Sequence, residues 1–166
     1  DVDGEDSLSG VIEVDETYVG GKRPGKRGRG AGGKTVVFGM MERDGDVMTK
    51  VVPNAKRETL HPIIEDNIAK GSTINSDEWQ AYRGLKKKGY EHKKVNHSEG
   101  EYVNGRIHVN SIESYWALLK RGIKGTHIHV SKKHLRKYIK EFEYRFNSRK
   151  NPEMMFPELL SEFEKK

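Results

Sequence analysis

Residues 10–19 read GVIEVDETYV, and this stretch decides the fold. Its side chains divide into two alternating sets, Val11, Glu13, Asp15 and Thr17 against Ile12, Val14, Glu16 and Tyr18. Successive side chains of a β-strand point to opposite faces, so an alternation with a period of two predicts a strand. We place Asp15 near the end of this strand.

The next segment, residues 20–34, reads GGKRPGKRGRGAGGK and contains almost no apolar side chain, so we expect a flexible basic loop. Residues 28–35 formally fit the phosphate-binding pattern G-x-x-x-x-G-K-[ST]. That motif requires an apolar strand before it and a helix after it, and neither is present. We therefore expect no nucleotide cofactor. The loop is interpreted either as a linker or as a contact to DNA phosphates made by Lys22, Arg23, Lys26, Arg27 and Arg29.

Four further elements follow from the pattern. Residues 35–52 hold two β-rich runs around Asp44-Gly45, a dipeptide that suits a tight hairpin turn. Residues 57–70 have helical spacing, and Gly71 is the expected stop. Residues 72–76 predict a short strand with Asp77 at its carboxyl end, and a fifth strand is expected within residues 90–95.

Two helices close the pattern. Residues 110–123 read NSIESYWALLKRGI and predict one apolar face and one polar face. The apolar face holds Ile112, Trp116, Leu119 and Ile123, and the polar face holds Asn110, Glu113, Ala117 and Lys120. Residues 132–147 repeat this logic. The whole order predicts an α/β sandwich with a mixed five-stranded sheet flanked by helices.

Length and composition limit the possibilities. A chain of 166 residues suits one domain, which we place at residues 11–150 between a leader, 1–10, and a tail or short helix, 151–166. Because it begins at Asp1, we expect it to be part of a longer protein. Lys and Arg number 31 against 25 Asp and Glu, a net charge of +6 that favours a polyanionic partner or simply a solvated cationic surface.

The residue types exclude several classes. The chain has no cysteine, which excludes a disulfide framework, a thiol nucleophile and a zinc-thiolate site. Its apolar runs are shorter than the roughly 20 residues of a membrane span, so we expect no membrane partner and a cytoplasmic or nucleoid location.

Three acids form the candidate site. Asp15 and Asp77 are expected at strand ends and Glu113 on a helix that docks on the same sheet, 35 residues after Asp77 (113 − 77 − 1). Carboxylates are natural ligands for Mg²⁺ or Mn²⁺, and two such cations about 3.5–4 Å apart promote phosphodiester chemistry. Bound cations would also relieve the mutual repulsion of the acids.

The motifs VDETYVGGK, SDEWQAY, HVNSIESYWALLKR and KHLRKYIKEFEYRFNSR resemble insertion-sequence transposases of the DDE type, which are related to retroviral integrases and have a ribonuclease H-like fold. This resemblance extends over residues 11–149. It implies that Asp15, Asp77 and Glu113 hold two Mg²⁺ or Mn²⁺ ions and that Lys120 contacts DNA. It also implies cleavage of double-stranded DNA at the ends of the element and transfer into target DNA by a homodimer or larger oligomer.

Several alternatives stay open. Asn110 is a rival to Glu113 as third ligand, and Asn110 and Arg121 are further candidate DNA contacts. Trp79 and Trp116 are interpreted as core aromatics more readily than as platforms for unpaired bases. His127, His129 and His134 are interpreted as surface or DNA-facing residues rather than as a metal site. The activity could also be that of a nuclease or resolvase, or the chain could be a non-catalytic DNA-binding domain.

Overall fold

The computed structural model describes residues 7–20, 33–77, 79–95, 109–125 and 132–150. Predictions that concern residues 1–6 of the leader, the C-terminal tail and most of the basic loop lie outside these residues. The same is true of seven singled-out side chains, Lys22, Arg23, Lys26, Arg27, Arg29, His127 and His129.

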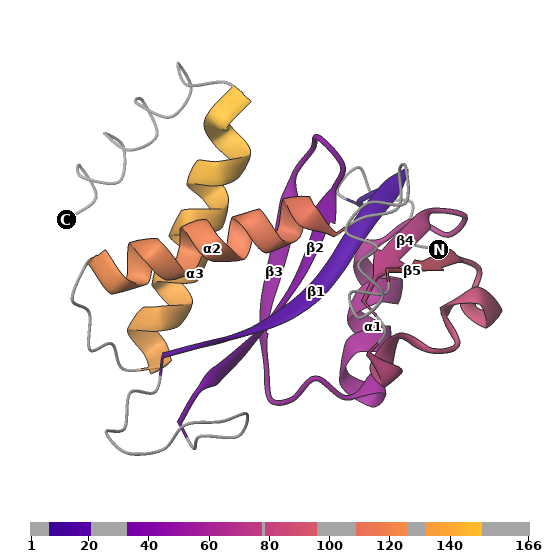
Figure 1. Ribbon diagram of the computed structural model, residues 1–166, viewed down its shortest axis with the longest axis horizontal. Coiled ribbons are helices and arrows are strands. Elements are labelled where there is room, and N and C mark those ends of the chain that lie inside the picture. Colours follow the sequence, from indigo (N-terminus) through magenta and orange to yellow (C-terminus); the bar gives the residue numbers. More distant parts are fainter. Residues whose placement is uncertain (1–6, 21–32, 78, 96–108, 126–131, 151–166) are drawn as a thin grey trace.

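A mixed sheet of five strands forms the centre of the molecule, with the order β3-β2-β1-β4-β5 (Figure 1). Strands β1, β2 and β3 form an antiparallel meander, whereas β4 is parallel to β1 and β5 is parallel to β4. This is the mixed sheet of a ribonuclease H-like fold, as predicted. The bounds are β1 Val11–Val19, β2 Thr35–Glu42, β3 Val47–Val52, β4 Thr73–Ser76 and β5 Glu91–Lys94.

Helices cover both faces of the sheet. The described part of the chain has three α-helices, α1 Arg57–Asn67, α2 Asn110–Gly125 and α3 Lys132–Asn147. In Figure 1, α2 and α3 lie together on one side of the meander, and α1 lies beside β4 and β5. Short 3-10 turns at Gln80–Tyr82 and Leu85–Lys88 connect β4 to β5. No described helix is long and apolar enough to cross a membrane.

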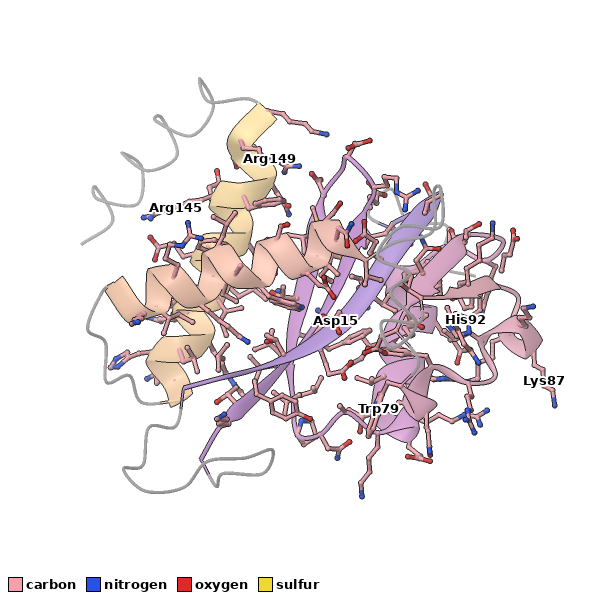
Figure 2. The ribbon with its side chains drawn as sticks, viewed as in Figure 1. Asp15, Trp79, Lys87, His92, Arg145 and Arg149 are labelled. Atoms are coloured by element: carbon pink, nitrogen blue, oxygen red, sulfur yellow. The ribbon has the colours of Figure 1, made fainter. Side chains whose placement is uncertain are left out.

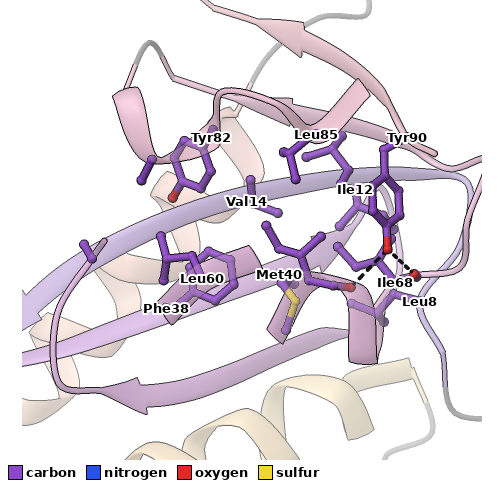
Figure 3. Close-up of a cluster of buried hydrophobic side chains, with 14 of the residues drawn as sticks. Leu8, Ile12, Val14, Phe38, Met40, Leu60, Ile68, Tyr82, Leu85 and Tyr90 are labelled. Atoms are coloured by element: carbon purple, nitrogen blue, oxygen red, sulfur yellow. Dashed lines mark hydrogen bonds between the residues drawn. The ribbon is translucent and has the colours of Figure 1, made fainter. Parts of the chain in front are cut away.

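One apolar cluster fills the space between α1 and the sheet (Figure 3). The even-numbered residues Ile12 and Val14 of β1 contribute to it, together with Phe38, Leu60 and Ile74. Each of these side chains is completely buried. Burial of such a side chain contributes about 1.5–3 kcal/mol, so this cluster is a main source of stability.

A second cluster lies on the opposite face, under α2 and α3. Ile112, Trp116 and Leu119 are buried there and Ile123 packs against it, which confirms the predicted apolar face of α2. Tyr115, also buried, packs edge-to-face against Trp116 of its own helix and against Phe142 of α3. The two helices therefore dock through aromatic contacts as well as aliphatic ones.

Side chains of α3 cover the outer edge of β3. The Asn147 amide accepts a hydrogen bond from Val47 N and donates one to Val47 O, both at 2.9 Å. Glu143 accepts from Thr49 N at 3.0 Å, and Lys140 donates to Thr49 O at 2.7 Å. An edge strand would otherwise expose these backbone groups to pairing with another chain, so α3 protects the sheet from edge-to-edge association.

One predicted boundary is wrong. Helix α1 ends at Asn67 rather than continuing to residue 70. The reason is a bridge to Leu8, which donates to Asn67 O and accepts from Ala69 N, and so holds Ile68 in an extended conformation. The hairpin lies where predicted, but residues 43–46 connect its strands, and Asp44, at φ 59°, takes the left-handed conformation.

Candidate metal centre

Asp15 lies in the middle of β1, not near its end as predicted. The strand continues because β2 pairs with it along its whole length, with Asp15 opposite Gly39. On its other side, β1 pairs with β4 only as far as Glu13 opposite Asn75. Two residues further along both strands, the same register brings Asp15 level with Asp77, where β4 has ended. The predicted position of Asp77, directly after β4, is confirmed.

Three carboxylates gather at this point: Asp15, Glu16 and Asp77. One carboxylate oxygen of each lies within 4.8 Å of the others. All three side chains are partly buried. Among the described residues, no Lys or Arg side chain forms an ion pair with Asp15 or Asp77. The donor set is therefore entirely oxygen and rich in negative charge, which suits a hard divalent cation.

The electrostatic strain is greatest at Asp15. Burial raises the pKa of its carboxyl from 3.8 to about 8, helped by the negative charges of Glu16, Asp77 and Glu113. The ionised form is disfavoured because it loses water and meets like charges. A divalent cation would reverse both effects, since its charge stabilises the carboxylate form.

Trp116 fixes one oxygen of Asp15. Its indole Nε1 donates to Asp15 Oδ2 at 3.2 Å, and only 4% of the side chain is exposed. The ring fits because Gly39, the cross-strand partner of Asp15, has no side chain. A Cβ on Gly39 would lie 2.5 Å from Trp116 Cζ2 and 3.0 Å from Ile112 Cδ1. The core interpretation of Trp116 is confirmed, and its polar atom also reaches the acid cluster.

Glu16 reaches the cluster from the opposite face of β1. The hydroxyl of Tyr82 donates to Glu16 Oε2. Tyr82 is completely buried, and burial, followed by the nearby Glu16 carboxylate, raises the pKa of its phenol well above the usual value. The Tyr82 hydroxyl therefore stays protonated, and the hydrogen bond that it donates orients the Glu16 carboxylate.

Glu13 joins β1 to α2. Its completely buried carboxylate accepts hydrogen bonds from Ser111 N at 3.0 Å and from Ile112 N at 3.2 Å, so it caps the amino end of the helix. Glu113 lies in the first turn of α2. Its side chain is exposed and lies outside the group of acids within 4.8 Å, but its charge acts on Asp15.

Two contacts orient the segment around Asp77. Its Oδ1 accepts a hydrogen bond from Trp79 N at 2.9 Å. Its backbone carbonyl accepts from Ser76 Oγ at 2.8 Å, and Ser76 Oγ lies 2.7 Å from His92 Nε2 of β5. Burial, with the nearby charges of Lys94 and Lys86, lowers the pKa of His92 to about 4. His92 is therefore neutral near pH 7, and this chain of contacts positions Asp77 without adding charge.

The other predicted site residues lie on the surface. Asn110, Lys120 and Arg121 are exposed on α2, and His134 is exposed on α3. Ala117 is also exposed, which confirms the polar face of α2. Trp79 is 44% exposed, so its interpretation as a core aromatic is wrong.

Sequence reasoning missed four contributors to the site, namely Glu13, Glu16, Gly39 and Tyr82. Alternation along β1 places Glu16 on the face opposite Asp15, which hides their proximity. Glu16 adjoins Asp15 in VDETYV and Tyr82 lies in SDEWQAY. The presence of Glu16 and Tyr82 in motifs that also hold Asp15 and Asp77 was the signal that could have identified them.

The sheet topology and the acid cluster define the class, a ribonuclease H-like α/β protein with a carboxylate centre. Residues 7–147 match the ISXO2-like transposase domain, and the chain belongs to this family.

Two curated relatives are each 32% identical to this chain. One is an uncharacterized transposase-like protein of Haemophilus influenzae, matched over 61% of this chain and 81% of the relative. The other is an uncharacterized protein in the transposable element ISH50 of Halobacterium salinarum, matched over 83% of this chain. The chain spans about half (52%) of the length of that second relative.

Among solved structures, the catalytic core domain of BIV integrase matches with a TM-score of 0.49 and 13% sequence identity. The match covers 79% of this chain and 81% of the integrase chain.

Proposed function

We propose that this chain is the catalytic core of an insertion-sequence transposase, which cleaves DNA at the ends of the element and joins the freed ends to target DNA. The observation that carries the proposal is the meeting of Asp15, Glu16 and Asp77 within 4.8 Å, in a chain of a transposase family. Residues 11–150 form the catalytic domain in this proposal.

The acids present fit a divalent cation site. Asp15 and Asp77 would hold Mg²⁺ or Mn²⁺ as principal ligands, with Glu113 as the third ligand and Glu16 within reach. Two bound cations would stabilise charge on the phosphate and lower the pKa of water. Asn110, the rival third ligand, is the first residue of α2 and precedes Glu113 by one helical turn.

The chain's own groups prepare this site. Trp116 Nε1 and Trp79 N each fix one oxygen of a principal ligand. Tyr82 orients Glu16, and Glu13 holds the end of α2 from which Glu113 projects. No protein nucleophile is required, because water performs the cleavage and the freed 3′-hydroxyl of the DNA performs the joining.

Basic residues would hold the DNA. Lys120 and Arg121 lie exposed on α2, seven and eight residues after Glu113, and can reach phosphates near the acids. Arg23 and the other cations of the basic loop would extend this contact. The net charge of +6 favours such a partner. Because two ends must be joined to one target, the active form on chromosomal DNA would be a homodimer or larger.

A strand-transfer assay tests the proposal. Labelled element-end DNA and a target plasmid are incubated with the protein in Mg²⁺ or Mn²⁺. We expect cleaved and joined products, both lost in Asp77→Asn and both kept in Asp66→Asn, which alters an exposed acid on α1.

The products separate this activity from the alternatives. Cleavage without joining would indicate a nuclease or resolvase, and binding without cleavage would indicate a non-catalytic domain. Unchanged metal-dependent cleavage in Asp77→Asn would show that the site assignment is wrong.

A further inference from the structure

Trp79 is a large aromatic side chain that is not buried in either apolar cluster. It leaves 44% of its surface exposed, whereas Trp116, the other tryptophan of the chain, is 4% exposed. Figure 2 shows Trp79 beside α1, with Asp15 on the neighbouring part of β1. Its backbone N–H binds Asp77 Oδ1 at 2.9 Å, which fixes the residue directly beside the acid cluster.

The indole is also held at its polar end. Trp79 Nε1 donates to Ala55 O at 3.0 Å, in the loop between β3 and α1. Asn54 makes this loop rigid, because its Oδ1 accepts from Lys56 N at 3.0 Å and from Thr59 Oγ1 at 2.6 Å. A ring anchored in this way loses little conformational entropy when a ligand packs on it.

Three exposed cations follow these anchors in the chain. Lys56 follows Ala55 directly and is exposed, and so are Arg57 and Arg83. The Arg57 guanidinium lies over Gly84, where an added Cβ would come within 2.6 Å of Nη2. The Arg57 guanidinium therefore lies close to the end of the turn Gln80–Tyr82, which Arg83 follows directly. An exposed indole with exposed cations close to it in the chain favours an anionic, aromatic ligand.

We propose that Trp79 stacks on an unpaired nucleobase next to the phosphate at the acid cluster, while Lys56, Arg57 and Arg83 contact the backbone of that strand. The proposal rests on the proposed function, because cleavage creates a strand end at the acid cluster and joining uses that end. A base inside a duplex is covered by its neighbours on both faces, whereas a base at a frayed or single-stranded end offers a free face. This surface therefore selects an opened DNA end over intact duplex.

The test uses the whole chain in EDTA, so that catalysis plays no part. A DNA hairpin with a short 3′ single-stranded overhang is compared with its blunt counterpart by fluorescence anisotropy. We expect Trp79→Ala to bind the overhang about 10-fold more weakly and the blunt DNA with unchanged affinity. Trp79→Phe, which keeps a ring but loses the indole N–H, should stay within about 3-fold of the original chain.

A matched control and a spectroscopic signal complete the design. Tyr144→Ala removes an aromatic side chain of similar exposure, 42%, from α3 and should leave both affinities unchanged. Stacking should quench tryptophan fluorescence on binding of the overhang, and Trp79→Phe should abolish this quenching. Equal affinity of the original chain for the two DNAs, including no binding of either, would overturn the proposal. An equal loss of affinity for both DNAs in Trp79→Ala would overturn it too.

The binding result is independent of the strand-transfer result. If the chain neither cleaves nor joins DNA in Mg²⁺, the proposed function fails, while overhang binding in EDTA can still depend on Trp79. If strand transfer succeeds and Trp79→Ala binds the overhang normally, only the stacking proposal fails.

Discussion

Asp15 is the residue at which the fold and the proposed chemistry oppose each other. Its position in mid-strand buries a carboxyl group beside Glu16 and Asp77, so that the metal-free chain favours its protonated form. The same position gives it a fixed orientation through Trp116. Stability is therefore sacrificed at the place where a cation is expected to bind, which is common at functional sites.

The burial of Asp15 should make the unfolding free energy of the metal-free protein depend on pH. The pKa of Asp15 is about 8 in the folded chain and about 3.8 when unfolded, so the folded state holds the proton more tightly. The stability that this tighter proton binding gives the folded state is complete below the unfolded pKa and is lost as the pH rises towards 8. In EDTA, Asp15→Asn should gain stability over the original chain by up to about 1.4 kcal/mol per pH unit across this range.

Urea unfolding at pH 5, 6.5 and 8 measures this difference. Asp66→Asn, on the exposed surface of α1, serves as control and should show no such trend. A difference between Asp15→Asn and the original chain that stays constant from pH 5 to pH 8 would contradict the raised pKa.

Gly39 should be intolerant of even one added carbon. In Gly39→Ala the new Cβ meets the Trp116 ring at 2.5 Å and cannot be accommodated without moving the indole away from Asp15. We expect a loss of about 1–3 kcal/mol in unfolding free energy, together with weaker Mn²⁺ binding. Thermal unfolding and isothermal titration measure the two effects.

Trp116→Phe separates packing from hydrogen bonding. It keeps an aromatic ring under Gly39 but has no N–H to donate to Asp15. Weaker Mn²⁺ binding in this variant would assign the effect to the lost hydrogen bond, whereas unchanged binding in both variants would show that Trp116 only fills space.

At this scale the sequence predicts that Asp15 and Asp77 lie close together, but not that Glu16 joins them. Asp77 follows β4 as predicted. The closeness of Asp15 and Glu16 could not be read from alternation, because it depends on where β4 stops beside β1. The roles of Asp15, Asp77 and Glu113 as metal ligands stay predictions.

At the scale of secondary-structure elements, the contact between β1 and α2 sets the position of the helix that carries Glu113. Glu13 lies two residues before Asp15 on the same face of the strand, and its carboxylate caps the helix that carries Glu113. One strand therefore supplies an acid of the cluster and also fixes the helix that presents another. Charge on a capping side chain strengthens this contact, because the amino end of a helix is electropositive.

Removal of the cap should weaken both stability and cation binding. Glu13→Ala leaves the part-buried N–H of Ser111 and the buried N–H of Ile112 without this acceptor, which costs about 2–3 kcal/mol of unfolding free energy. Glu42→Ala removes an exposed acceptor of Ser9 N and should cost less than about 1 kcal/mol. Urea unfolding of the two variants measures the loss of unfolding free energy in each. Equal losses would show that the Glu13 cap stabilises the fold no more than an exposed hydrogen bond does.

The elements themselves were largely predictable. Strong periodicity predicted α3 at residues 132–147, as observed, and the hairpin lies around Asp44-Gly45, as predicted. The end of α1 was not predictable, because Leu8 pairs with Ile68 through a contact between distant parts of the chain. The protection of β3 by Asn147 and Glu143 also depends on tertiary docking that local pattern does not encode.

At the scale of the whole molecule, the layers explain why the site forms where it does. Two apolar clusters bind helices to both faces of the sheet, and the acids gather beside β1 where its pairing with β4 ends. Lys120 and Arg121 are exposed on α2, the helix that also carries Glu113. Lys56, Arg57 and Arg83 are exposed in the segments that adjoin Ala55 and Trp79. This arrangement fits the ISXO2-like transposase domain family, to which the chain belongs.

The most direct test of the cation site is an isothermal titration of Mn²⁺ into the protein at pH 7. We predict saturable binding that Asp77→Asn and Asp15→Asn each weaken at least about 10-fold, as expected when a carboxylate ligand is lost. Glu58→Gln, which alters an exposed glutamate in the first turn of α1, should bind as the original chain does. Binding of equal strength in Asp77→Asn and in Glu58→Gln would contradict the account.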